Sequence, residues 1–191
     1  MTEPNPIASS AATPAAVVNR RLLLGATAAS AALLGVGAAW WRAQTPGLPP
    51  ATPPVDGFWA MQWDTPQGGT VAMQAFQGRP LLVNFWATWC APCVDELPLI
   101  NAFYRQNKAN GWQVIGLAID KLAPVQTFLQ KMPLDFPIGM AGLSGAELGR
   151  GLGNLAGGLP FSVVLGRDGL VAQRKLGRLT PEDLAGWLRL K

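Results

Sequence analysis

Both cysteines of the chain lie in one short stretch, "NFWATWCAPCVDELP", at residues 84–98. Cys90 and Cys93 are separated by two residues, and the chain contains no histidine. Such a pair can stabilise a fold as a disulfide, supply part of a metal site or exchange electrons as a dithiol. These three uses need different surroundings, so the neighbouring residues discriminate among them.

A metal or haem site lacks the ligands that it would need. Zinc prefers four nitrogen, sulfur or carboxylate ligands, whereas this chain offers two thiolates and no imidazole. Covalent haem attachment requires a histidine directly after the second cysteine, where the chain has Val94. The missing histidine also excludes Cys-His and Ser-His-Asp catalysis. We expect no metal and no cofactor apart from the Cys90–Cys93 pair itself.

As a structural disulfide the pair would contribute little, because closing a loop of about four residues stabilises a fold by roughly 2 kcal/mol. A redox role is better supported. Cys90 falls where an apolar run ends and a helix begins, so free amides and the helix dipole favour its thiolate. Cys93 lies on the same helical face and can close a disulfide. Pro92 stiffens the turn between them. We predict that Cys90 attacks a partner and that Cys93 resolves the product.

The cysteine pair sits within a predicted strand–helix–strand unit. Residues 81–87 form a short continuous apolar run, as in a central strand buried on both faces, and residues 91–107 have a helical pattern. A second buried strand is predicted at 112–119, followed by a helix at 122–132 with Pro124 in its first turn. Two buried strands joined by a helix form a parallel pair with a right-handed crossover.

The remaining elements complete an α/β fold. Short strands are predicted at 58–63 and 71–76, on either side of a turn. Residues 161–177 contain two strand-like runs around "RDG" and predict an antiparallel hairpin at the sheet edge. The stretch "TPEDLAGWLRL" at 180–190 begins with helix-capping residues, with Thr180 as the N-cap and Pro181 at the first helical position, which predicts a helix there. The glycine-rich stretch 141–158 predicts a connecting helix of undefined length. We expect a three-layer domain, with a mixed central sheet flanked by helices.

The first part of the chain predicts targeting rather than folding. Residues 1–21 are rich in Ala, Pro, Ser and Thr and predict a disordered cytoplasmic region. Residues 22–41 carry no charge, and a helix of that length, at ~1.5 Å per residue, spans the ~30 Å of a bilayer's hydrocarbon. Residues 42–57 are rich in proline and predict a stiff spacer. The folded domain is predicted over 58–191.

Charges around the apolar run predict its orientation. The Arg20–Arg21 pair precedes the run and Arg42 follows it, which places the N-terminus in the cytoplasm and the domain outside. The arginine pair is similar to a twin-arginine export signal. Small residues at 36–38 suit a signal peptidase, whereas Trp40–Trp41 favours a retained membrane anchor. A buried soluble helix is the remaining interpretation of this segment.

Overall charge and length exclude other classes of function. The net charge is +4, but the basic residues are spread along the chain without a basic cluster. We therefore expect no nucleic-acid partner. A chain of 191 residues is long enough for one cored domain plus an extra segment, and we expect a monomer.

The stretch "LLVNFWATWCAPCVDELP" closely resembles the active-site strand and helix of the thioredoxin superfamily, and within it the exported TlpA/ResA-like thiol:disulfide reductases. The resemblance extends from about residue 58 to 190. Asn84 stands where thioredoxin has a buried aspartate used for proton transfer, and Glu96 matches the acidic residue of the TlpA/ResA-like pattern. The resemblance implies that Glu96 handles the Cys93 proton. The alternative is an ordinary solvated helix residue.

A second stretch, "GGLPFSVVLGRDG", resembles the superfamily's second signature. This resemblance implies a cis peptide bond before Pro160, a proline that faces the disulfide, and a Leu159 backbone that binds an extended partner peptide. Leu159 and Phe161 depart from the Thr- or Val-like residues usual there, which leaves the substrate preference open. Trp89 either shields one side of the site or packs in the core.

The resemblance implies a periplasmic enzyme at the bacterial inner membrane, or free in the periplasm if the signal is cleaved. Its expected partners are disulfide-bearing exported proteins, such as apocytochrome c during cytochrome maturation, and a membrane thiol electron donor. The motif does not fix the direction of electron flow, so a disulfide oxidase or isomerase is the alternative. A peroxiredoxin is disfavoured because Val83 and Ala87 replace its Pro and Thr. A non-redox peptide-binding module is the last alternative.

Overall fold

The computed structural model describes residues 51–190. The predicted tail at 1–21, the apolar run at 22–41 and the spacer up to residue 50 lie outside the described residues. Within 51–190, none of the helices combines the length and the apolar character needed to cross a bilayer.

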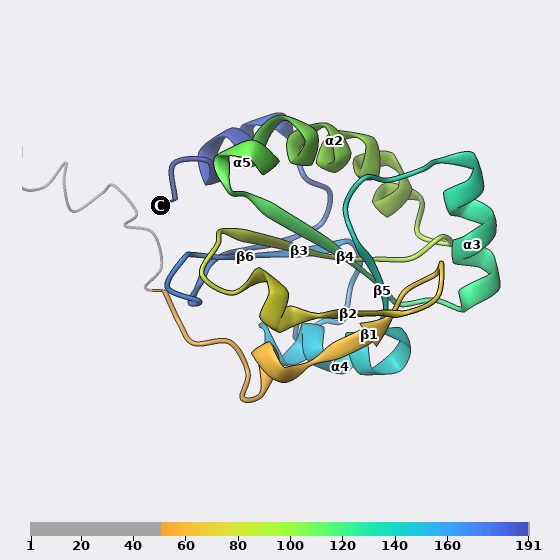
Figure 1. Cartoon of the computed structure of the whole chain (residues 1–191), viewed down its shortest axis with the longest axis horizontal. Helices are drawn as coiled ribbons and strands as arrows, with labels where there is room; N and C mark the ends of the chain where they lie inside the picture. Colours follow the sequence, from red (N-terminus) through yellow and green to blue (C-terminus); the bar gives the residue numbers. More distant parts are fainter. Residues whose placement is uncertain (1–50, 191) are drawn as a thin grey trace, which may run out of the picture. The chain divides into compact units, whose positions relative to one another are not determined.

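A five-stranded mixed sheet forms the centre of the domain, with strand order β5-β4-β3-β6-β7 (Figure 1). The strands are β3 (Leu81–Trp86), β4 (Gln113–Ala118), β5 (Ile138–Met140), β6 (Phe161–Leu165) and β7 (Val171–Leu176). β3, β4 and β5 are parallel, whereas β6 and β7 run antiparallel to their neighbours. The predicted parallel pair and the predicted edge hairpin are both confirmed.

Helices cover both faces of this sheet. α2 (Ala91–Asn107) and α5 (Pro181–Trp187) lie on one face in Figure 1, and α3 (Leu122–Lys131) contributes Val125 to the same hydrophobic cluster. α4 (Gly142–Gly151) lies on the opposite face together with an N-terminal hairpin formed by β1 (Gln62–Asp64) and β2 (Thr70–Ala72). A short 3-10 helix, η3 (Lys108–Asn110), follows α2. The helices on both faces of the sheet confirm the predicted three-layer α/β fold.

The central strand β3 is buried along its whole length, as its continuous apolar run predicts. Because successive side chains of a strand point to opposite faces, Leu82 and Trp86 pack beneath α2 and α5. Leu81, Val83 and Phe85 pack on the face covered by α4. Asn84 shares the face of Leu82 and Trp86, so the strand carries one polar side chain beneath α2.

The N-terminal hairpin differs from its prediction, because a strand over 58–63 is wrong. The structure has a 3-10 helix, η1 (Phe58–Ala60), followed by a shorter strand, β1 (Gln62–Asp64). Gly57 precedes η1 with a φ of 75°, a conformation that glycine adopts without strain. The resulting turn buries Phe58.

The predicted strand over 71–76 is likewise shorter than expected. β2 covers Thr70–Ala72, and the chain continues as a 3-10 helix, η2 (Met73–Phe76). Met73 and Phe76 are both buried in the core. Residues three apart lie on one side of a 3-10 turn but on opposite sides of a strand, so the turn buries both side chains.

Two elements were poorly specified by the sequence. β5 has only three residues and was not predicted, because a strand of that length has no detectable period. The glycine-rich stretch 141–158 forms α4 as far as Gly151 and continues as a loop that leads to β6. The final helix α5 begins as predicted, with Thr180 and Asp183 forming a reciprocal capping box.

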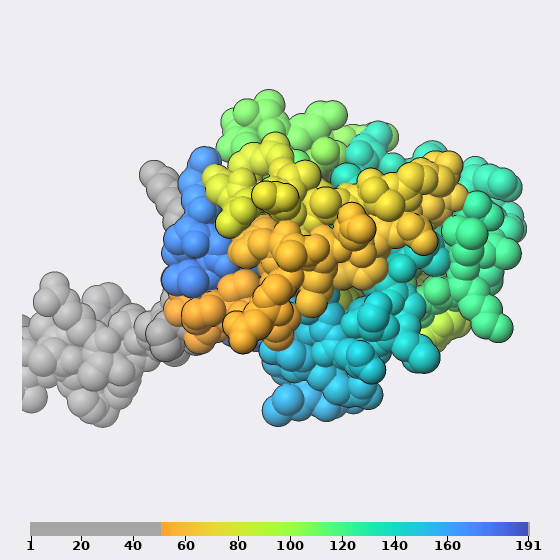
Figure 2. All heavy atoms as spheres, turned by 60° about the horizontal axis from the view of Figure 1, so that its bottom comes forward, coloured from red at the N-terminus to blue at the C-terminus, as the bar shows by residue number. Residues whose placement is uncertain are grey.

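The residues just before the predicted domain boundary contact the domain. Thr52 forms a β-bridge with Val171, and Arg174 Nη2 donates a hydrogen bond of 2.8 Å to Thr52 Oγ1. Figure 2 shows the N-terminal part of the described chain, in orange, spread across the same side of the molecule as α4, in cyan. The end of the proline-rich spacer is therefore docked on the domain, and the boundary at residue 58 stays a prediction.

Candidate active site

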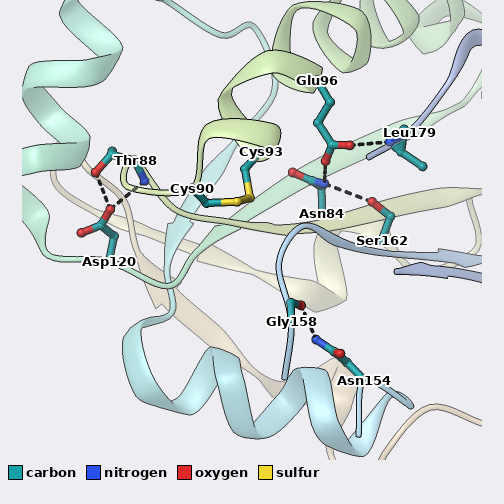
Figure 3. The surroundings of a disulfide bond; sticks show 10 residues. All are labelled: Asn84, Thr88, Cys90, Cys93, Glu96, Asp120, Asn154, Gly158, Ser162 and Leu179. Carbon is teal, nitrogen blue, oxygen red and sulfur yellow. Dashed lines mark hydrogen bonds between the residues drawn. A yellow bond between two sulfur atoms is a disulfide. The ribbon is translucent and has the colours of Figure 1, made fainter. Parts of the chain in front are cut away.

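The two cysteines are joined at the start of α2, in the turn that follows β3 (Figure 3). The Cys90–Cys93 disulfide has an S–S distance of 2.06 Å and a Cα–Cα distance of 5.3 Å. Cys90 is the N-cap residue of α2 and is 6% exposed, whereas Cys93 is 0% exposed. A partner thiol can therefore approach Cys90 and not Cys93, which is the asymmetry needed by an attacking and a resolving cysteine.

The turn that carries Cys90 is held by an aspartate from the neighbouring strand. Asp120 follows β4, and its Oδ2 accepts hydrogen bonds from Thr88 N at 2.8 Å and from Thr88 Oγ1 at 2.6 Å (Figure 3). Sequence analysis missed Asp120. Its signal was available, because a polar residue directly after a buried parallel strand lies at the carboxyl edge of the sheet, where ligands and functional loops gather.

Pro160 lies beside the end of β3, and the Leu159–Pro160 peptide bond is cis, as the resemblance implied. Phe161 pairs with Phe85 in the antiparallel β3–β6 ladder. Pro160 therefore sits at the same sheet edge from which the cysteine turn departs. Asn154 Nδ2 donates a 2.8 Å hydrogen bond to Gly158 O and shapes the loop that leads to this proline.

Trp89 projects from the turn immediately before Cys90 and is 69% exposed. Core packing, one of its two predicted roles, is therefore excluded. An indole left in solvent next to a reactive disulfide offers a large apolar face to an incoming partner. The shielding or partner-binding role of Trp89 stays a prediction, as do the roles of Pro92 and Leu159.

Glu96 is fully buried on the side of α2 that faces the sheet, so the alternative of a solvated helix residue is wrong. Its Oε1 accepts a hydrogen bond of 2.7 Å from Asn84 Nδ2, and its Oε2 accepts one of 2.6 Å from Leu179 N. Burial raises the pKa of Glu96 above its ordinary value, while the hydrogen bonds from Leu179 and Asn84 act in the opposite direction.

Asn84 links this carboxylate to the central sheet. Asn84 Nδ2 also donates a 3.0 Å hydrogen bond to Ser162 Oγ (Figure 3). Ser162 is the residue of β6 that pairs with Asn84 across the sheet. Asn84, Glu96 and Ser162 thus form a buried polar cluster next to the disulfide. Sequence analysis found Asn84 and Glu96 but missed Ser162, because the pairing register of β3 with β6 is not visible in the sequence.

Comparisons with known proteins place this geometry in a family. The Redoxin family model matches residues 58–187. The chain is 31% identical over 125 residues to the thiol-disulfide oxidoreductase ResA of Bacillus cereus (strain ZK / E33L), a match that covers 64% of this chain and 69% of ResA.

Solved structures agree with the sequence matches. A thiol:disulfide interchange protein of the thioredoxin family from Chlorobium tepidum TLS superposes with a TM-score of 0.64 at 24% identity, over 74% of this chain and 96% of that protein. StoA from Bacillus subtilis superposes with a TM-score of 0.56 at 25% identity, over 68% of this chain and 96% of StoA.

The fold, the disulfide at the start of α2 and the sequence matches agree with one another. The family match covers the whole segment from η1 to the end of α5, including both cysteines and Pro160. The chain therefore belongs to the Redoxin family and is a thiol-disulfide oxidoreductase of the ResA type within the thioredoxin superfamily.

Proposed function

We propose that this enzyme reduces disulfides in proteins outside the cytoplasm, with Cys90 as the attacking and Cys93 as the resolving cysteine. The observation that carries the proposal is the unequal burial of the two residues, at 6% exposure for Cys90 and 0% for Cys93. A dithiol that reacts with large protein partners needs one sulfur at the surface and one protected from competing reactions.

The reaction proceeds in two exchanges. The Cys90 thiolate attacks one sulfur of a partner disulfide, and the other partner sulfur leaves as a thiolate that takes up a proton. Cys93 then attacks Cys90 Sγ, the mixed disulfide breaks, and the second partner sulfur leaves as a thiolate that takes up the proton given up by Cys93. Two electrons pass from the dithiol to the partner, and Cys90 and Cys93 end as the disulfide seen here. A membrane thiol electron donor would restore the dithiol.

The partner is proposed to dock as an extended segment across the turn that carries Cys90. The backbone of Leu159, next to the cis-Pro160 bond, offers hydrogen-bonding groups to the backbone of the partner. Such backbone pairing depends little on the partner's side chains, so partners of many sequences can bind. Trp89, the residue before Cys90, provides an exposed apolar surface, and Pro92 fixes the first turn of α2. Apocytochrome c is a representative substrate of this class, since it presents a cysteine pair in an unfolded chain.

The location outside the cytoplasm rests on residues 22–41 and the arginines around them. An uncharged run of this length followed by a proline-rich spacer suits a domain that is tethered to a membrane and held away from its surface. We propose a domain on the periplasmic face of the inner membrane, acting as a monomer without nucleic-acid partners.

Replacing Cys93 with serine should trap substrates. Cys90 would still attack a partner disulfide, but the mixed disulfide could not be resolved, so covalent complexes should accumulate and dissociate on reduction. Non-reducing electrophoresis of cell extracts measures them. The matched control is Cys90→Ser, which should give none. A module that binds peptides without redox chemistry would give the same bands for both variants, and that result would exclude the proposed reaction.

The reduction potential of the Cys90–Cys93 pair should identify the direction of electron flow. A reductant should lie near the ~−270 mV of thioredoxin rather than the ~−120 mV of strongly oxidising disulfide donors. Equilibration in glutathione buffers of known composition, followed by quantification of free thiols, measures this value. A potential near ~−180 mV would instead favour an isomerase, and a value near ~−120 mV would favour an oxidase.

Replacing Glu96 with glutamine should change the pH dependence of thiol ionisation in the reduced enzyme. Because the pKa of Glu96 is raised, its carboxylate becomes charged at a higher pH than an ordinary glutamate. Once formed, this buried negative charge disfavours a second negative charge on the Cys93 thiolate. Thiolate absorbance should therefore develop at lower pH in Glu96→Gln. The matched control is Asp95→Asn, which removes an exposed carboxylate 3.6 Å from Arg178. Superimposable curves for the wild type and Glu96→Gln would contradict a role for Glu96.

The full chain should remain in the membrane fraction of a bacterial host after a high-salt wash and be released by detergent. Replacing Leu33 and Leu34 with arginine should prevent this retention, since each central arginine costs about 3 kcal/mol of insertion free energy. Fractionation and immunoblotting measure the result. A mature N-terminus near residue 39 or 43 would show instead that the segment is a cleaved signal.

A further inference from the structure

One polar atom beside the disulfide lacks a partner. Asn84 Oδ1 is buried and accepts no hydrogen bond from any residue of the described chain, although the nitrogen of the same amide donates two. A buried carbonyl without a donor is unfavourable, because nothing replaces the hydrogen bonds that water would give it. In Figure 3 the Asn84 nitrogen faces Glu96 and Ser162, and its oxygen lies on the side of Cys93.

We propose that Asn84 Oδ1 accepts a hydrogen bond from the Cys93 thiol when the disulfide is reduced. In the disulfide form Cys93 carries no proton, so the neighbouring oxygen has nothing to accept. Reduction adds a thiol at a residue with 0% exposure, where water does not serve as its acceptor. The Cys93 thiol then donates to Asn84 Oδ1, so both groups have a hydrogen-bond partner. Reduction of the disulfide thus creates the donor that Asn84 Oδ1 lacks in the oxidised enzyme.

Glu96 fixes the amide in the orientation that this contact requires. An ionised carboxylate only accepts hydrogen bonds, and the Glu96 oxygens receive theirs from Asn84 Nδ2 and Leu179 N. Turning the Asn84 amide over would place its carbonyl against the carboxylate. Ser162 Oγ can donate or accept, so it tolerates either orientation and does not choose between them. Glu96 therefore keeps the Asn84 oxygen, and not its nitrogen, on the side of Cys93.

In this arrangement Asn84 is a positioning residue. Its amide oxygen accepts a hydrogen bond but takes no proton, so it stabilises the protonated thiol of Cys93 and with it the dithiol form of the enzyme. The disulfide form gains nothing from the same atom. The inference rests on the thiol–disulfide chemistry of the family and does not depend on which proteins the enzyme reduces.

The S–H stretching band of Cys93 tests the contact directly. In a Cys90→Ser background Cys93 is the sole thiol, and its infrared band should have the lowered frequency of a hydrogen-bonded S–H. Adding Asn84→Ala should move the band to the frequency of a free thiol. Adding Ser162→Ala should leave it in place, because that change removes a partner of Asn84 Nδ2 and keeps Oδ1.

Glu96→Gln provides a second variant of nearly unchanged shape, should Asn84→Ala fail to fold. The carbonyl oxygen of the substituted side chain would accept from Leu179 N, so its amide NH2 would face Asn84. The Asn84 carbonyl would then turn towards that donor and away from Cys93. The Cys93 band should then move to the free frequency as well. A band unchanged by Asn84→Ala, or by Glu96→Gln where the alanine variant does not fold, overturns the proposal.

The dithiol–disulfide equilibrium supplies an independent readout with both cysteines present. Loss of a modest hydrogen bond to a thiol should shift the equilibrium in glutathione buffer roughly two- to fivefold towards the disulfide in Asn84→Ala. Ser162→Ala should shift it less than Asn84→Ala does. An Asn84→Ala equilibrium equal to that of the wild type contradicts the proposal. Both readouts compare a variant with its own parent protein, so they do not depend on the absolute potential of the wild type or on the trapping of partners, which test the proposed function.

Discussion

A carboxylate buried without solvent is the constraint on which the active site depends. A charged group removed from water is tolerated only when donors replace its hydration. Glu96 in α2 meets this condition through Asn84 in β3 and the backbone of Leu179 just before α5. Removing either donor would leave the carboxylate unsatisfied. The relative positions of the strand, the active-site helix and the last helix are therefore coupled through one side chain.

This coupling determines where the cysteines lie. Asn84 is two residues before the end of β3, and Glu96 is one turn beyond Cys93 in α2. Joining the two side chains fixes the start of α2 over the end of the strand. Asp120 holds Thr88 in the intervening turn from the other side. The turn that carries Cys90 is thus fixed at both ends, and Cys90 keeps a small exposed fraction while Cys93 is fully buried.

The parts of this arrangement that were predicted from the sequence are local. The strand at 81–87, the helix at 91–107 and the capped α5 are encoded in continuous stretches whose period or end signals are strong. The cis bond before Pro160 was predictable only through resemblance, because the residues alone do not distinguish it from an ordinary trans bond.

The contacts that were missed join segments distant in sequence. Ser162 reaches Asn84 across 78 residues, and Asp120 reaches Thr88 across 32. Both depend on strand register and sheet order, which no single stretch specifies. The incorrect strands at 58–63 and 71–76 have the same origin, since the burial of Phe58, Met73 and Phe76 against a distant core overrides the local pattern.

The buried cluster also accounts for the amide at position 84, where thioredoxin has an aspartate. Asn84 Nδ2 lies 2.7 Å from Glu96 Oε1, so a carboxylate at position 84 would place two acidic groups in direct contact inside the domain. Two such groups do not both ionise, and one would hold a proton well above its ordinary pKa. An amide avoids this conflict, since its nitrogen donates to the carboxylate and its oxygen remains free to face the cysteines. The titrating group, Glu96, and the oxygen that lies on the side of Cys93 in Figure 3, that of Asn84, therefore belong to two residues, and Glu96 sets the orientation of the Asn84 amide.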